Sequence, residues 1–328
     1  MAELTLETHM TLPIDRSRAL RRFALSDAIF RGLTRTCAIG VLVILGAIML
    51  SLLEGSWLAL STFGFSFVTV EDWNPVTEEF GALAPIYGTL VTSLLAMVIA
   101  VPLGLGIAIF LTELCPPVLR RPIGIAIELL AGIPSIIYGI WGLFVFAPFL
   151  QQHVQPGVIE FFADVPVLNI LFAGPPYGIG VLTASLILVI MVLPFIVAIT
   201  RDVFETVPAV LRESAYGLGC SRWEVISKVI IPYTRVGVIG GGMLALGRAL
   251  GETMAVTFVI GNAHHIASSI LSPGTTISAT IANEFAEAVG DTYFSALIAL
   301  GLMLFLITFI VLAVARYMLL RLERQAGT

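Results

Sequence analysis

The sequence predicts an all-α integral membrane protein with six transmembrane helices. Hydrophobic residues make up 58% of the 328 residues and charged residues only 12%, whereas a soluble domain has about a quarter of its residues charged. Six hydrophobic runs reach the roughly 20 residues that a helix needs to cross a bilayer. Backbone polar groups in lipid must be satisfied within the segment, so these continuous runs indicate helices. The alternating pattern of a membrane β-barrel is excluded.

The expected helices span residues 37–60, 83–111, 123–150, 177–200, 236–261 and 293–320, so that residues 37–320 form the transmembrane domain. Residues 1–36 precede it as a basic segment, which could be a helix lying on the membrane surface or a disordered tail. No small-residue cleavage site follows the first run, so we expect that run to be retained. Pro102, Pro134 and Pro194 should each kink a helix. Residues 321–328 form a short tail.

The basic residues predict the orientation of the chain. Sixteen of the 17 Lys and Arg residues lie before the first helix, in the second and fourth loops, or near the C-terminus. The loops at about 61–82, 151–176 and 262–292 contain none. Because cationic loops stay in the cytoplasm, both termini are expected inside and those three loops outside. The remaining basic residue is Arg248.

The fourth loop, residues 201–235, carries a spaced motif. Glu213-Ser214-Ala215 precedes Gly219 by a short gap, and nine further residues lead to Val229-Ile-Ile-Pro232. The small residues suit a helix that seats in a groove of another protein, and Gly219 permits a turn between two short helices. Pro232 is expected to end this unit before the fifth helix begins. An ordinary solvated amphipathic loop is the alternative.

Arg248 is the candidate substrate residue. It follows Arg235 by 13 residues, or about 20 Å along a helix axis, which places it near the middle of the bilayer at a cost of roughly 2.5–3.5 kcal/mol. Glu252 follows at i+4, on the same face of a continuous helix. That face also carries the small residues Gly237, Gly241, Ala245 and Ala255. Small neighbours suggest space for a translocated anion, whereas a purely structural ion pair would need none.

Other acidic residues are less informative. Glu128, about a turn and a half inside the third helix, is a possible secondary site residue that could pair with Arg248 or with a partner. Glu113 lies near a helix end, where it is expected to reach water.

Five stretches carry a family resemblance: residues 85–93 (PIYGTLVTS), 132–142 (GIPSIIYGIWG), 213–220 (ESAYGLGC), 246–256 (LGRALGETMAV) and 282–288 (ANEFAEA). With them, the chain resembles the PstC-type permease subunits of phosphate-specific ABC transporters, which are ABC importer permeases with an EAA motif. The motif departs mildly from the family pattern at Ser214, Val229 and Ile231. The resemblance implies the type I ABC importer permease fold and a multi-pass location in a bacterial inner membrane.

The resemblance also implies the partners. The chain would be one permease half of an ATP-driven inorganic phosphate importer, beside a sister permease (PstA-like), two ATPase subunits (PstB-like) and a periplasmic phosphate-binding protein (PstS-like). The ATPases would hold ATP and magnesium and would dock on Glu213, Ser214, Ala215, Gly219 and Pro232. Arg248 and Glu252 match family residues implicated in transport. The chain itself would be no enzyme and bind no cofactor, since its only lysine, Lys228, lies outside any P-loop motif. Membrane lipid is an expected partner, and nucleic acid is not.

Two other function classes stay open on the residues alone. An ABC permease for another oxyanion, such as sulfate or molybdate, is separated from a phosphate permease only by the resemblance. An ion-gradient-driven anion transporter would explain Arg248 but not the motif at 213–232, and no inverted repeat is visible. A membrane sensor or enzyme is unsupported, because the sequence shows no catalytic triad, metal set or signalling domain.

Overall fold

A computed structural model describes residues 16–326, and the side chains of residues 23–321. Of the expected terminal segments, residues 1–15 and 327–328 therefore lie outside the described part. The chain divides into two units, Met1–Ser51 and Leu52–Thr328. The sites and contacts discussed below lie within the second unit.

Six helices in the described residues are long and apolar enough to cross a membrane, which confirms the predicted number. The helical runs that contain them are α1 (Arg16–Phe63); α3 (Leu83–Ile109) with the π-helical turn η1 (Phe110–Leu114); α5 (Ser135–Trp141), η2 (Gly142–Phe146), α6 (Ala147–Phe149), η3 (Leu150–Val154) and α7 (Gln155–Phe162); α9 (Val181–Glu205); α11 (Arg222–Val225), η4 (Ile226–Ile230) and α12 (Ile231–Leu250); and α15 (Asp291–Ala326). The shorter elements are α2 (Ser66–Thr69), β1 (Trp73–Asn74), β2 (Glu79–Phe80), α4 (Pro117–Ala131), α8 (Leu168–Leu171), α10 (Ala209–Gly217), α13 (Met254–Ile260) and α14 (Ile277–Glu284).

The third predicted helix is two helices rather than one kinked helix. α4 ends at Ala131, and Pro134 adopts an extended conformation (φ −57°, ψ 138°) directly before α5. Proline has no N–H to continue a helix, and it suits the residue just outside a helix start. The hydroxyl of Tyr138 donates a hydrogen bond of 2.9 Å to the Leu130 carbonyl across the break. By contrast, Pro102 and Pro194 lie inside uninterrupted helices.

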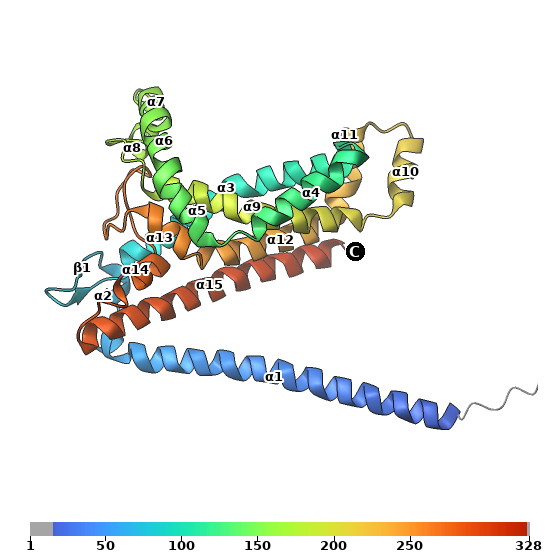
Figure 1. The fold of residues 1–328 in the computed structure, drawn as a ribbon, viewed down its shortest axis with the longest axis horizontal. Helices are drawn as coiled ribbons and strands as arrows, with labels where there is room; N and C mark the ends of the chain where they lie inside the picture. Colours follow the sequence, from blue (N-terminus) through green and yellow to red (C-terminus); the bar gives the residue numbers. More distant parts are fainter. Residues whose placement is uncertain (1–15, 327–328) are drawn as a thin grey trace, which may run out of the picture. The chain divides into compact units, whose positions relative to one another are not determined.

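The centre of the second unit is a layer formed by α3, α9 and α12 (Figure 1). α3 and α9 approach closely because Gly104 has no side chain; a Cβ there would lie 2.5 Å from Ile196. The core between these helices consists of Ala96, Ala100, Leu188, Val189, Val192, Ile196, Ala245 and Ala249.

The connecting segments gather at the two ends of this layer. α10 and α11 lie at one end, and α13 and α14 lie at the other (Figure 1). At the second end β1 pairs with β2 in antiparallel register, Trp73 opposite Phe80. Trp73, Phe80 and Tyr293 form one buried aromatic cluster there.

Candidate functional site

Arg248 lies in the last turn of α12 and its side chain is exposed on this chain. Its guanidinium carbon is 4.5 Å from the centroid of the Phe195 ring on α9. None of the ion pairs among the described residues includes Arg248. The aromatic face and the carbonyls at the C-terminal end of α12 therefore compensate its charge in part. The cation is left with room for an anionic partner from outside the chain.

Arg248 and Glu252 do not lie on the same face of one continuous helix, so that prediction is wrong. α12 ends at Leu250 and α13 begins at Met254, so Glu252 lies in the connection between two helices. Gly251, with φ −96° and ψ 3°, departs from helical geometry at this point, and glycine is a poor helix former. Glu252 is half-buried and makes no ion pair with Arg248.

The small residues of α12 serve helix packing rather than open space. A Cβ on Gly237 would lie 2.5 Å from the Val203 side chain, and a Cβ on Gly241 would lie 2.7 Å from Ile199. Ala245, next along this face, is 1% exposed. The face is therefore filled by α9, and small residues allow the two helices to approach. Contrary to the expectation, these residues therefore leave no open space for a substrate on this face.

The loop between α9 and α12 has the expected helix–turn–helix. α10 ends at Gly217, and Gly219 adopts φ +87°, a left-handed conformation that favours glycine. Ser221 and Glu224 then form a capping box at the start of α11: the Glu224 N–H donates to the Ser221 hydroxyl (3.4 Å) and the Ser221 N–H donates to the Glu224 carboxylate (3.0 Å). These reciprocal bonds fix where the second short helix begins.

Pro232 does not end this unit, contrary to the prediction. α11, η4 and α12 follow one another without interruption, and Pro232 lies at the second residue of α12. A proline lacks an N–H and its ring crowds the carbonyl four residues earlier, here that of Lys228. Lys228 lies within the π-helical turn η4, whose wider ladder accommodates the missing bond.

The motif residues differ in exposure. Glu213 and Ser214 are exposed, whereas Ala215 is 8% exposed and packs in the cluster at the root of the loop. Large apolar side chains on the same loop face outward: Val210 is 70% exposed, Leu218 85% and Trp223 67%. We call these three residues the loop patch. Where exposed apolar side chains form one continuous surface, they mark a contact site for another protein or a membrane.

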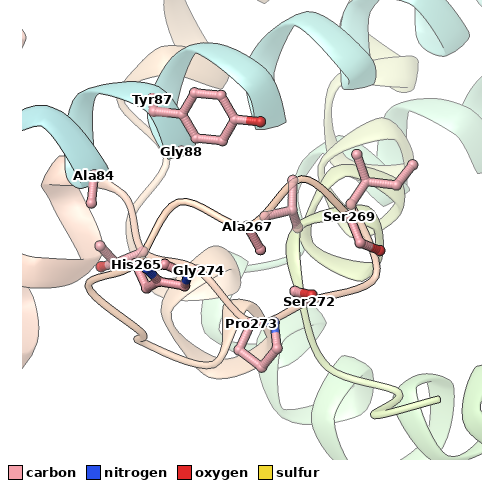
Figure 2. A pocket seen from close by; sticks show the side chains of 12 residues that line it. Ala84, Tyr87, Gly88, His265, Ala267, Ser269, Ser272, Pro273 and Gly274 are labelled. Carbon is pink, nitrogen blue, oxygen red and sulfur yellow. The ribbon is translucent and has the colours of Figure 1, made fainter. Parts of the chain in front are cut away.

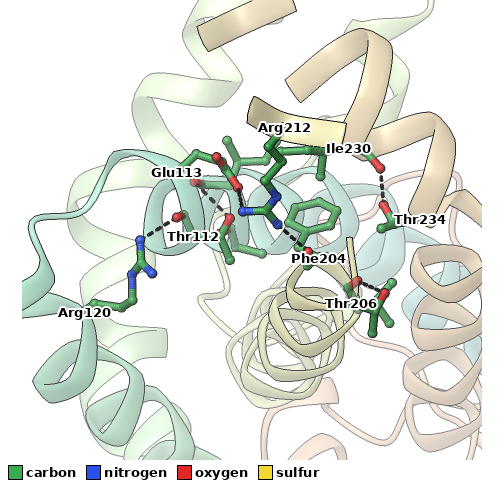
Figure 3. Close-up of polar contacts among 11 residues, drawn as sticks. Thr112, Glu113, Arg120, Phe204, Thr206, Arg212, Ile230 and Thr234 are labelled. Atoms are coloured by element: carbon green, nitrogen blue, oxygen red, sulfur yellow. Dashed lines mark hydrogen bonds and ion pairs between the residues drawn. The ribbon is translucent and has the colours of Figure 1, made fainter. Parts of the chain in front are cut away.

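Sequence reasoning missed an ion pair at the root of this loop, shown in Figure 3. Arg212 of α10 lies 3.0 Å from Glu113 of η1, and it also donates to the carbonyl of Phe204 in the last turn of α9. Only 8% of the Glu113 side chain is exposed, so the expectation that it reaches water is wrong. The two residues are distant in sequence and belong to different helices, so no spacing rule could pair them.

Glu128 is placed on α4, where it forms an ion pair of 2.9 Å with Arg201 of α9. Its expected partner Arg248 is therefore replaced by Arg201. The reason is that α4 packs against α9, which brings Glu128 beside Arg201.

At the opposite end, Glu284 of α14 joins three segments. Its carboxylate accepts hydrogen bonds from Trp73 (2.7 Å) and Tyr293 (2.7 Å), and it lies 2.8 Å from Nε2 of His264. The ring of His264 also stacks on Trp73, with 5.6 Å between centroids. Burial raises the pKa of Glu284, but the bonds from His264, Tyr293 and Trp73 outweigh it and hold that pKa below its ordinary value.

The segment at 262–276 packs over the ends of α9 and α3. The N–H groups of Val181 and Leu182, at the start of α9, donate to the carbonyls of Ser272 (3.2 Å) and Ile270 (2.8 Å). Helix N-termini leave such donors unsatisfied, so this segment acts as the cap of α9. A small pocket, lined by Tyr87, His265 and Ser269 among others, lies between this segment and α3 (Figure 2).

Comparisons with known proteins place the chain in a family. Residues 100–324 match the family described as "Binding-protein-dependent transport system inner membrane component". The "Phosphate transport system permease protein PstC" of Mesorhizobium japonicum is 70% identical over 312 residues, which cover 95% of each chain. The protein of the same name from Pasteurella multocida is 60% identical over 301 residues, covering 92% of this chain and 94% of that one.

A solved structure agrees on the fold. It is that of a bacterial ABC transporter involved in the import of the acidic polysaccharide alginate, with a TM-score of 0.61 at 16% identity, covering 92% of this chain and 99% of that one. At that identity the likeness shows the fold alone, and the fold is that of the type I ABC permeases, as the resemblance predicted. The chain therefore belongs to the inner membrane components of binding-protein-dependent transport systems and, among them, to the PstC-type permeases.

Proposed function

We propose that the chain is one permease half of an ATP-driven importer of inorganic phosphate in a bacterial inner membrane. Relatives named as phosphate transport system permeases, at 70% and 60% identity over almost the whole chain, support this substrate. A sister permease would complete the pathway, two ATPase subunits would bind and hydrolyse ATP with magnesium, and a periplasmic binding protein would deliver phosphate.

The observation that carries the proposal is that Arg248 is exposed and has no ion-pair partner among the described residues. A guanidinium on a spanning helix, without a carboxylate partner among the described residues, needs an anion. Its planar pair of N–H donors matches two oxygens of a phosphate. Glu252, in the connection that follows α12, is the candidate acceptor for a hydrogen bond from the hydroxyl group of HPO₄²⁻. Arg248 and Glu252 need not form an ion pair with each other when no phosphate is bound.

The basic loops support the predicted orientation, in which both termini and the α10–α11 loop face the cytoplasm. In that orientation the loop patch and the exposed Glu213 and Ser214 form the docking surface for an ATPase subunit, while Gly219 shapes the turn. Closure of the ATPase pair on ATP would displace α10 and rock the spanning helices, which opens the pathway outward. The segment at 262–276 would then face the binding protein.

The test is uptake of labelled phosphate by vesicles that contain the whole complex. Uptake should require ATP and the binding protein, and excess sulfate should not compete. Arg248→Ala should leave the complex assembled but reduce uptake at least a hundredfold, and Arg248→Lys should restore only part of it, because an ammonium lacks the planar two-donor fork.

Arg316 of α15 offers a matched control. It is also an exposed arginine on a spanning helix, so Arg316→Ala should retain most of the uptake. Near-normal uptake by Arg248→Ala would contradict the assignment of Arg248. Equal competition by sulfate would instead contradict the choice of phosphate and favour a broader oxyanion permease.

A further inference from the structure

An ion pair joins α10 to the end of α3. Arg212 binds Glu113, the fourth residue of the π-helical turn that continues α3, at 3.0 Å. The side chains of Arg212 and Glu113 are 23% and 8% exposed. Phe204, whose carbonyl accepts a hydrogen bond from Arg212, belongs to a buried apolar cluster with Ala108, Val207, Ala215, Val225, Ile226 and Ile230. A charge held in such surroundings cannot exchange its partner for water at low cost, so Glu113 and Arg212 move together.

At its other end, α3 contacts the segment at 262–276 and the first residue of α14. A Cβ on Gly88 would lie 1.8 Å from the carbonyl oxygen of Thr275, so helix and segment are in direct backbone contact. The N–H of Ile277 donates a 3.0 Å hydrogen bond to the hydroxyl of Thr89. Figure 2 shows Tyr87 and Gly88 on α3 beside the segment that contains Ser272 and Gly274. The backbones of Gly88 and Thr275 are in contact here, beside the small pocket lined by Tyr87, His265 and Ser269, so a shift of Gly88 toward Thr275 meets backbone atoms directly.

Between these two joints α3 is continuous. The helix runs from Leu83 through Ile109 and directly into η1, despite the internal Pro102. Thr89 and Glu113 are about 35 Å apart along its axis at 1.5 Å per residue. α3 is held against α9 over this length through small buried residues: Ala96, Ala100 and Gly104. The helix therefore connects the two joints without a break.

We propose that α3 transmits motion between the ATPase-docking loop and the segment at 262–276, and that Glu113 and Arg212 are the positioning residues that connect it to α10. This inference rests on the proposed function. Displacement of α10 pulls Glu113 through Arg212, shifts α3, and moves Gly88 and Thr89 against the segment at 262–276. Because coupling between two sites is reciprocal, a binding protein that displaces this segment also acts on the ATPases by the same route.

The readout is ATP hydrolysis by the reconstituted complex, measured without and with phosphate-loaded binding protein on the outside. The Glu113→Gln, Arg212→Gln double variant removes both charges and leaves no unpaired ion. It should keep its basal hydrolysis within twofold, while the stimulation by loaded binding protein and the phosphate transported per ATP fall at least fivefold. If the pair only maintained the fold, basal hydrolysis would fall together with the stimulation and the transport.

Lys228→Gln is the matched control. Lys228 forms an ion pair of 3.2 Å with Glu224 in the same loop, but this pair is exposed and joins neighbouring turns of one helical run. This variant should retain the stimulation of the wild type. An equal loss in Lys228→Gln would overturn the proposal, since it would mean that any charge change in the loop disturbs ATPase docking.

A double-mutant cycle tests the transmission itself. Thr89→Val removes the acceptor for the Ile277 N–H at one joint, and Arg212→Gln weakens the other joint. Residues this far apart normally have independent effects. If both act in series through α3, the double variant should be no worse than the more damaged single variant. Multiplied losses would overturn the proposal.

The outcomes separate the inference from the proposed function. The Glu113→Gln, Arg212→Gln variant is called the Gln–Gln variant. If it does not assemble, Arg212→Lys, which keeps the charge opposite Glu113, replaces Arg212→Gln in the double-mutant cycle with Thr89→Val. Full stimulation in the assembled Gln–Gln variant refutes the role of the pair while wild-type uptake still stands. A wild-type complex without phosphate uptake would refute the proposed function, whatever these variants do.

Discussion

Gly88→Ala tests the close contact between α3 and the segment at 262–276. The added Cβ would lie 1.8 Å from the Thr275 carbonyl oxygen, and real Cβ atoms do not approach closer than 3.0 Å, so the backbones must separate by at least 1.2 Å. Overpacking of this kind costs about 1–3 kcal/mol. Loss of the adjacent bond between Thr89 and the Ile277 N–H adds about 1 kcal/mol. Alanine is a better helix former than glycine by about 0.5–1 kcal/mol, so a net loss of about 1–3 kcal/mol is expected.

Gly106→Ala is the control, because Gly106 lies on the same helix with nothing within 4 Å of its Cβ position. It should raise the thermal midpoint of the detergent-solubilised chain slightly, whereas Gly88→Ala should lower it. Hydrogen exchange should also accelerate at residues 262–276 in Gly88→Ala and stay unchanged in the control. Equal midpoints for the two variants, with unchanged exchange at this segment, would refute the contact.

Three further predictions concern the site, the pH response and the topology. Glu252→Gln should increase competition by sulfate in the uptake assay, because the wild-type carboxylate accepts a hydrogen bond from the phosphate hydroxyl and repels the fully deprotonated sulfate; unchanged selectivity would contradict this role. The lowered pKa of Glu284 means that its stabilising effect is present above its ordinary pKa of 4.5 and is lost as the pH falls through the lower folded value. Thermal midpoints measured between pH 6 and pH 3 should therefore fall less steeply in Glu284→Gln than in the wild type. In a background without native cysteines, an impermeant thiol reagent should label Glu78→Cys only from outside and Arg121→Cys only from inside, and the reverse would overturn the orientation.

The six spanning helices could be predicted because hydropathy reports burial in lipid directly. The breaks could not be predicted, because similar local signals have different outcomes. Pro102 and Pro194 are absorbed within α3 and α9, whereas Pro134 separates two helices. The difference lies in tertiary contacts such as the bond from the Tyr138 hydroxyl to the Leu130 carbonyl, which satisfies an acceptor at the end of α4.

The sequence alone points to Arg248 as a candidate site residue, but it does not predict the surroundings of that residue. Arg248 stood out because its place in the fifth hydrophobic run predicts a charge far from both membrane surfaces, which is costly. The assumption of a continuous helix then gave Glu252 the wrong position and gave Gly237 and Gly241 the wrong role. The pair of Glu113 and Arg212 has no local signature, since each residue taken alone reads as an ordinary charge near a helix end.

The cap of α9 has a consequence for the biogenesis of the protein. The N–H groups of Gly180, Val181 and Leu182 are satisfied by the carbonyls of Val259, Ser272 and Ile270, all of which are synthesised later. At a translation rate of about 5–20 residues per second, the newly inserted α9 waits for several seconds until its acceptors emerge. During this interval the helix end must keep contact with water or with the insertion machinery. A chain truncated before residue 270 should therefore insert α9 in a shallower and more protease-sensitive position than the complete chain.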